Sequence, residues 1–367
     1  MFSPQQLKAE LDKYVIGQEE AKRTLCVAVT NHYKAIAHNT KKPFDTHIEK
    51  SNIILAGHTG SGKTLLVRTI AEILNVPCYI QDCTKITQAG YVGSDVEDCL
   101  VGLLRACNYD VHKAEMGIVM LDEGDKMAAR HAGPSITRDV SGEGVQQSLL
   151  KIIEGDRVGV PPMGGRKHPE QSLIYVDTHN ILFILSGAFA GIEDIIKRRL
   201  TTDERAIGFD ANASKQQLPK DDIFNHLTPQ DLRYFGMIPE FVGRFPIITH
   251  VNRLEKADLV RILTEPNNAI VRQFQALFAM DKVDLQFTPE ALDLIATIAI
   301  RNRTGARGLR AVLERVLEEA MFELVPSRKR TNKLFTITED YIRQHLPSRL
   351  LASYPPASNP SPLASNL

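Results

Sequence analysis

The sequence has little that points to a membrane, a secretory route or a nucleic-acid surface. Lysine plus arginine and aspartate plus glutamate both number 44, so the formal net charge is zero, and charge alone attracts neither nucleic acid nor acidic lipid. No apolar stretch approaches the length of a membrane span. The N-terminal residues are polar and charged, without the apolar core of a cleavable signal. We therefore expect a soluble, cytoplasmic protein, with an organelle left open, and no partner among membranes or nucleic acids.

Cysteine is also scarce, and its spacing does not suggest a metal site. The five cysteines are scattered through apolar segments, at Cys26, Cys78, Cys83, Cys99 and Cys107. No C-x-x-C pair occurs, and no cysteine lies beside a histidine at zinc spacing. We expect reduced cysteines in the core and no zinc.

What is present begins with a glycine-rich run, GHTGSGKT at residues 57–64, which fits the template G-x-x-x-x-G-K-[ST]. An apolar segment, 52–56, precedes it and predicts a strand, and 65–74 predicts a helix. In that setting the glycines turn backbone N–H groups towards phosphate, Lys63 reaches the outer phosphates and Thr64 ligates Mg²⁺. A glycine-rich turn that fits by chance is the alternative. The expected nucleotide-binding residues here are Gly57, His58, Thr59, Gly60, Ser61, Gly62, Lys63, Thr64 and Leu65.

A second motif predicts hydrolysis. Residues 117–121 form an apolar run that ends in Asp122 and Glu123, and parallel sheets bind their ligands at the carboxyl ends of the strands. Asp122 would hold Mg²⁺, and Glu123 would polarise the attacking water. The alternative is a strand end whose acids simply face solvent.

The order of elements predicts an α/β fold with a parallel sheet covered by helices on both faces, followed by a smaller, mainly helical α+β domain. Further strands are expected at 77–81 and 180–185, and helices at 4–13, 18–38, 94–107 and 143–153, with Ser94 and Glu97 as a capping box. Past Pro246, helices are expected at 256–264, 266–279, 289–301 and 306–323, with a strand at 283–287. The expected domains are 1–248 and 249–348, with 349–367 a disordered tail.

Several polar or exposed segments leave two interpretations open. Tyr91 and Val92 lie between glycines, as an apolar loop tip or as a turn that packs on its own domain. Residues 161–169 form a loop that carries three basic side chains, which are solvated or attract an acidic partner. Arg244 and Arg307 either stabilise phosphoryl transfer or form surface ion pairs of small effect.

Taken together, these motifs resemble the ClpX family, the AAA+ unfoldases that feed the ClpP peptidase, from about residue 7 to 349. The segments that carry the resemblance are 14–18 (YVIGQ), the glycine-rich run, 89–93 (AGYVG), 135–155, 164–169 (GGRKHP), 239–244 and 304–310. The resemblance implies an ATP-dependent, homo-hexameric unfoldase that threads unfolded or tagged proteins into a ClpP-type peptidase, with ATP and Mg²⁺ as cofactors.

The resemblance also implies roles for single residues. Residues 14–18, among them Val15 and Ile16, would line the adenine pocket, and Asn180 would be the sensor-1 residue that orients water. Arg244 would be the arginine finger for the adjacent subunit, and Arg307 the sensor-2 arginine. The remaining roles are the substrate pore, with Tyr91, Val92, Arg166, Lys167 and His168, a second pore loop at 133–142, and the peptidase-docking loop with Ile207, Gly208 and Phe209.

The chain departs from the family pattern in three places. Family members usually begin with a four-cysteine zinc domain, whereas this sequence starts almost at the AAA+ module. Gly124 follows the two acids where the family usually has a bulky aliphatic residue, and we expect it to loosen the backbone there and lower activity. The Pro- and Ser-rich tail has no role in the family pattern.

Three rival assignments remain open. An HslU-type unfoldase shares the GYVG loop but usually carries a large insertion after the acids, where this chain has only a short segment. A regulatory or weakly active ring subunit would bind nucleotide without turnover, which the retained Lys63, Asp122 and Glu123 argue against and Gly124 favours. An AAA+ protein acting on nucleic acid is disfavoured by the zero net charge.

Overall fold

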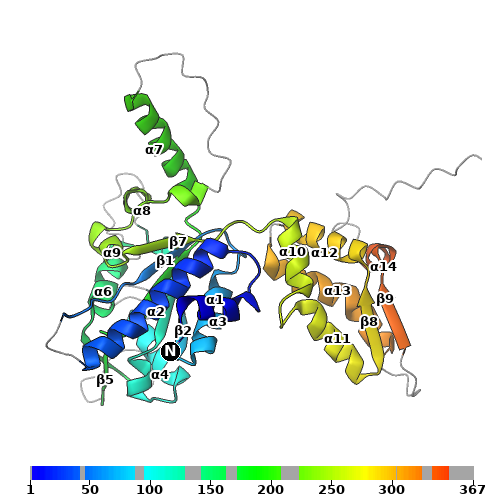
Figure 1. The fold of residues 1–367 in the computed structure, drawn as a ribbon, viewed down its shortest axis with the longest axis horizontal. Helices are drawn as coiled ribbons and strands as arrows, with labels where there is room; N and C mark the ends of the chain where they lie inside the picture. Colours follow the sequence, from blue (N-terminus) through cyan, green and yellow to red (C-terminus); the bar gives the residue numbers. More distant parts are fainter. Residues whose placement is uncertain are drawn as a thin grey trace, which may run out of the picture. The chain divides into compact units, whose positions relative to one another are not determined.

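The computed structural model describes residues 2–41, 46–86, 95–128, 142–162, 172–207, 223–302, 304–324 and 333–346, and of 202–207, 324 and 333 the backbone alone. The chain divides into two compact units, Met1–Arg253 and Leu254–Leu367. Each is described by itself below (Figure 1).

The first unit is built on a five-stranded sheet with the order β2-β3-β6-β1-β7, in which every neighbouring pair is parallel. Its strands are β1 (Ile53–Ala56), β2 (Cys78–Asp82), β3 (Ile118–Asp122), β6 (Leu182–Gly187) and β7 (Ile247–His250). The expected α/β fold with a parallel sheet is confirmed. Strand β7 runs past residue 248, the expected domain boundary, and pairs with β1.

Both faces of this sheet are buried, which explains why its strands are almost continuously apolar. In β1, Ile53 and Leu55 belong to one core cluster, and Ile54 and Ala56 belong to the other. The first cluster includes residues of α1 (Pro4–Asp12), α2 (Glu19–Lys41) and α3 (Lys63–Leu74). The second includes residues of α4 (Asp98–Ala106), α5 (Val111–Ala114), α6 (Glu143–Glu154), α7 (Ile192–Ile207), α8 (Pro229–Phe235) and α9 (Pro239–Gly243).

Shorter elements connect these layers. Three 3₁₀ turns are η1 (Cys83–Lys85), η2 (Gly124–Met127) and η3 (Ile223–His226), and an antiparallel hairpin joins β4 (Arg157–Val160) to β5 (Ile174–Asp177). The expected helix start at Ser94 is wrong, because α4 begins at Asp98 with Glu97 as its N-cap. Ser94 itself lies outside the described residues.

The second unit is smaller and mainly helical. Its elements are α10 (Lys256–Thr264), α11 (Ile270–Met280), β8 (Val283–Phe287), α12 (Pro289–Arg301), α13 (Ala306–Leu324), β9 (Lys333–Ile337) and α14 (Glu339–His345), with β8 parallel to β9. Thr288 caps α12 by accepting from the Ala291 N–H, and Pro289 takes the first helical position, as the sequence predicts. Across both units, none of the described helices combines the length and apolar character that crossing a bilayer requires.

One buried histidine of the first unit is kept neutral by the fold. His32 on α2 is only 4% exposed, and its Nε2 lies 3.0 Å from the backbone oxygen of Asn180. Its Nδ1 has no hydrogen-bond partner. Burial, with a smaller contribution from the nearby charge of Lys50, lowers the pKa of His32 to about 4.

We expect this histidine to make the free energy of unfolding fall with acidification. Because its folded pKa lies below the ordinary value, the unfolded chain binds the proton first, and stability is lost between about pH 6.5 and pH 4 at up to about 1.4 kcal/mol per pH unit. His32→Gln removes this contribution. Urea unfolding of the wild-type and His32→Gln proteins at pH 7 and pH 5 measures this contribution. If both proteins lost the same unfolding free energy between pH 7 and pH 5, His32 would not be the group responsible.

Candidate nucleotide-binding site

The loop after β1 has the shape of a phosphate cradle. Gly57, Gly60 and Gly62 adopt φ values of 138°, 79° and 98°, a region that favours glycine. A Cβ at Gly57 would also lie 2.6 Å from the carbonyl oxygen of Val251. Gly62 is the N-cap of α3, so the loop leads straight into a helix N-terminus, where free N–H groups and the helix dipole favour an anion.

Lys63 lies inside this loop. It is 8% exposed, and its Nζ donates to the carbonyl oxygens of Gly57 (2.5 Å) and His58 (2.9 Å). The Ser61 hydroxyl donates to the same His58 oxygen at 2.6 Å. A buried ammonium that donates to carbonyl oxygens is well placed to exchange them for phosphate oxygens, which carry full charge.

The sheet brings the first acid to the same loop. Asp122, at the end of β3, accepts at Oδ2 from the Thr64 hydroxyl (3.1 Å) and at Oδ1 from the Ser186 hydroxyl (3.0 Å). A hydroxyl and a carboxylate oxygen side by side fit Mg²⁺, which keeps most of its ligands as water and phosphate. In the described segments no three His, Cys, Asp or Glu side chains gather at one point.

The second acid stands on a strained turn. Glu123 is exposed and has a left-handed φ of 55°, an uncommon conformation for a residue other than glycine that often marks functional positions. Gly124 follows it, and a Cβ there would lie 2.3 Å from Cδ1 of Leu185 on β6. Leu185 therefore fills the space that a side chain at 124 would take, so the packing beside Glu123 is not left open as the sequence suggested.

A second loop, which precedes α2, is hydrogen-bonded to the cradle. Val15 and Ile16 are buried, and Gly17 and Gln18 both have left-handed φ values, 65° and 59°. The Gln18 amide forms a two-bond pair with the backbone of Asn252: Nε2 donates to the carbonyl oxygen (2.9 Å) and Oε1 accepts from the N–H (2.7 Å). The same Nε2 lies 3.4 Å from the Ser61 carbonyl oxygen, so Gln18 joins this loop to the cradle.

Comparison with known proteins shows the family of this chain. The family model "AAA domain (Cdc48 subfamily)" matches residues 48–248, and "C-terminal, D2-small domain, of ClpB protein" matches 254–336. A Borrelia duttonii protein named ATP-dependent Clp protease ATP-binding subunit ClpX is 53% identical over 340 residues, 93% of this chain and 78% of the relative. Proteins of the same name from Porphyromonas gingivalis and Bacteroides fragilis are each 50% identical, over 94% and 95% of this chain and 82% and 83% of the relatives. The chain belongs to the ClpX family of AAA+ proteins.

One residue assigned by the ClpX resemblance lies in the wrong place. Asn180 precedes β6 at its amino end, whereas the cradle lies at the carboxyl end, where the Gly57 N–H donates to the Gly187 carbonyl oxygen (3.2 Å). Asn180 therefore cannot orient water at the nucleotide. Ser186, which the sequence analysis missed, occupies the carboxyl end of this strand and bonds to Asp122; a hydroxyl closing an otherwise apolar strand was the available signal.

The two arginines of the ClpX pattern lie in different units. Arg244 follows α9 in the first unit, and its guanidinium pairs with Glu154. Arg307 is exposed in the first turn of α13 in the second unit. Ile207 is the last residue of α7, while the other expected pore and docking residues, Tyr91, Val92, Arg166, Lys167, His168, Gly208 and Phe209, lie outside the described residues.

The contact between Gly124 and Leu185 predicts the effect of restoring a family-like side chain. Gly124→Ile alone should destabilise the first unit by about 1–3 kcal/mol, because the new side chain overpacks against Leu185. Adding Leu185→Ala should recover part of that loss. Thermal unfolding of Gly124→Ile, Leu185→Ala and the double variant measures the coupling between the two positions. If Gly124→Ile were more stable than the wild type, the space beside Gly124 would be open.

Gln18 should matter for nucleotide affinity. Gln18→Ala removes the bonds to Asn252 and Ser61 that join the two loops, and we expect a loss of about 1–2 kcal/mol, or about 5- to 30-fold in Kd for ATP. Gln230→Ala, at an exposed glutamine of α8, is the matched control. Titration with a fluorescent ATP analogue measures both, and unchanged affinity in a folded Gln18→Ala chain would rule the role out.

Proposed function

We propose that this chain hydrolyses ATP and uses the energy to unfold proteins for a ClpP-type peptidase. The observation that carries the proposal is the meeting of Lys63, Thr64, Asp122 and Ser186 at one edge of the sheet. Membership of the ClpX family supports the link to a peptidase, because the named relatives are ATP-binding subunits of an ATP-dependent Clp protease.

At the nucleotide, each residue has a proposed role that its position supports. The N–H groups of the glycine loop and Lys63 bind the phosphates, and Thr64 and Asp122 hold Mg²⁺, which neutralises charge during phosphoryl transfer. Glu123 accepts a proton from the attacking water or orients it. Ser186 takes the place proposed earlier for Asn180, beside Asp122.

The remaining roles concern assembly, and the ClpX resemblance supports them. A homo-hexameric ring would place Arg244 at the nucleotide of the adjacent subunit, while Arg307 would couple the second unit to nucleotide. Tyr91 and Val92 would grip the substrate, with Arg166, Lys167 and His168 guiding it in. Ile207, Gly208 and Phe209 would dock on the peptidase.

The main rival is a regulatory ring subunit that binds nucleotide without turnover. Gly124 is the residue that favours it. Leu185 packs over Gly124, and Asp122 and Glu123 are both retained at the loop, which supports an active enzyme over this rival.

The decisive experiment follows the fluorescence of a stable fluorescent protein with an unstructured tail, mixed with the full chain, ATP and a ClpP peptidase. The wild-type chain should abolish the fluorescence in an ATP-dependent way. Glu123→Gln should bind ATP but turn it over at least about 10²-fold more slowly, because the residue that activates water is lost. Fluorescence should then persist.

Tyr91→Ala is the control for the coupling of hydrolysis to unfolding. It should keep its ATPase activity and lose unfolding. An absence of both hydrolysis and unfolding in the wild-type chain would favour the regulatory subunit. Hydrolysis without unfolding would show that the chain is an ATPase that needs a further recognition element.

A further inference from the structure

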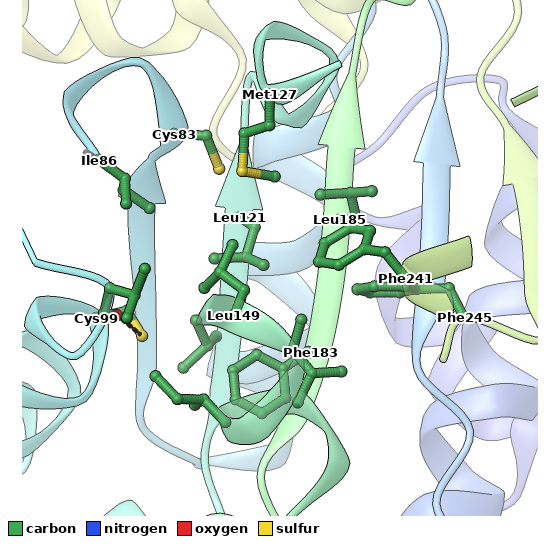
Figure 2. Packing of buried hydrophobic residues seen from close by; sticks show 14 of the residues in the cluster. Cys83, Ile86, Cys99, Leu121, Met127, Leu149, Phe183, Leu185, Phe241 and Phe245 are labelled. Carbon is green, nitrogen blue, oxygen red and sulfur yellow. Dashed lines mark hydrogen bonds between the residues drawn. The ribbon is translucent and has the colours of Figure 1, made fainter. Parts of the chain in front are cut away.

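Arg244 has a backbone that is firmly fixed to the core. Phe241 and Phe245 on either side of it are buried, with ring centroids 5.2 Å apart (Figure 2). The Arg244 N–H donates to the Phe241 carbonyl oxygen at 3.1 Å. Its own carbonyl oxygen accepts from Nδ2 of Asn52, just before β1, at 3.0 Å. Only the side chain of Arg244 is left to be oriented.

Glu154, the last residue of α6, orients that side chain. Its Oε1 accepts from Arg244 Nε at 2.8 Å and lies 2.6 Å from Nη2. The guanidinium is a planar fork. Glu154 contacts the edge formed by Nε and Nη2 and leaves Nη1 outside the pair. The Arg244 and Glu154 side chains are 52% and 41% exposed, so the pair adds little to stability. Its effect is to fix the orientation of the guanidinium.

The other end of α6 is tied to the turn that follows the catalytic acids. Gln146 is fully buried, and its Nε2 donates to the carbonyl oxygen of Met127 at 2.7 Å. Met127 closes η2, the turn that begins directly after Glu123. Oε1 of Gln146 accepts from the N–H of Ile238, the N-cap of α9, at 2.9 Å.

These contacts form a closed path within one chain. Gln146 and Glu154 are eight residues apart on α6, which is about 12 Å along a helix. Gln146 is hydrogen-bonded to the turn after Glu123 and to the start of α9. Glu154 is bonded to Arg244 at the end of α9. A rigid helix with both ends fixed leaves the guanidinium little freedom relative to the acids.

We propose that α6 positions Arg244 relative to the catalytic acids of its own chain, with Glu154 as the positioning residue for the guanidinium and Gln146 as the tie to the turn after Glu123. The inference rests on the proposed function, in which Arg244 reaches the nucleotide of an adjacent subunit. Since Glu154 binds one edge of the fork, the Nη1 end can meet phosphate while the pair stays intact. A conformational change at the nucleotide site of one subunit would thereby move the arginine that reaches the nucleotide site of the adjacent subunit.

The test measures steady-state ATP hydrolysis by the full chain. Glu154→Ala should lower kcat about tenfold with little change in KM, because an arginine that acts in the transition state is misdirected while ground-state binding is kept. Glu154→Gln should recover most of the activity, since its amide oxygen can still accept from Nε. Glu240→Ala, an exposed acid on α9, controls for lost negative charge near Arg244.

Arg244→Ala distinguishes the proposed role of the arginine from the positioning role of Glu154. Normal hydrolysis by Arg244→Ala would overturn the arginine's proposed role, and with it this inference. A severe loss in Arg244→Ala beside normal or raised kcat in Glu154→Ala would leave the proposed function standing and overturn the positioning role of Glu154.

Gln146→Met tests the tie at the other end, after its fold is checked by circular dichroism and nucleotide binding. If Gln146 and Glu154 orient the same arginine, the double variant should be no slower than the slower single variant. Multiplicative losses would show that the two act separately and would overturn the link through α6. If Gln146→Met does not fold, the Glu154 variants still decide whether Glu154 positions the arginine.

Discussion

The structure depends on the parallel register of three neighbouring strands. Because β3, β6 and β1 run in the same direction, with Leu121 beside Leu185 and Ala56 beside Gly187, their carboxyl ends come out together. Asp122 is thereby brought within hydrogen-bond distance of both Thr64, at the end of the glycine loop, and Ser186. The helices on both faces bury the strands and make that register rigid. The site is therefore a property of the sheet and not of any one loop.

The sequence predicts those parts of the site that are contained in one short stretch of chain. The glycine loop and the two acids each follow an apolar strand directly, so a short stretch of chain contains both the chemistry and its position. The cap and first turn of α12 are similarly local and are confirmed. The family is confirmed as well, since it depends on many such motifs in one order.

What the sequence does not predict depends on contacts between distant segments. Strand β6 was expected at 180–185 and lies at Leu182–Gly187, so the expected strand stopped one residue before Ser186. The role of Asn180 came from the family resemblance, and this residue lies at the amino end of the strand in either placement. Gln146 is an ordinary glutamine in the sequence, because its partners lie far along the chain. Gln18 belongs to the 14–18 segment that carries the resemblance, but its bonds to the distant Asn252 are not visible in the sequence. Strand β7 has only four residues, and no motif follows it in the sequence as the glycine loop follows the equally short β1.

The strand order also bears on how such a chain folds while it is being made. The strand that leads into the glycine loop, β1, pairs with β6 and β7 and, among the strands that the structure describes, with none nearer in sequence. At ribosomal rates of about 5–20 residues per second, its apolar residues wait several seconds for the first of these partners to be synthesised. Long-range parallel pairing is also slow in itself. During that interval, helices α1, α2 and α3, which are already made, are the available cover for the nascent strand against aggregation.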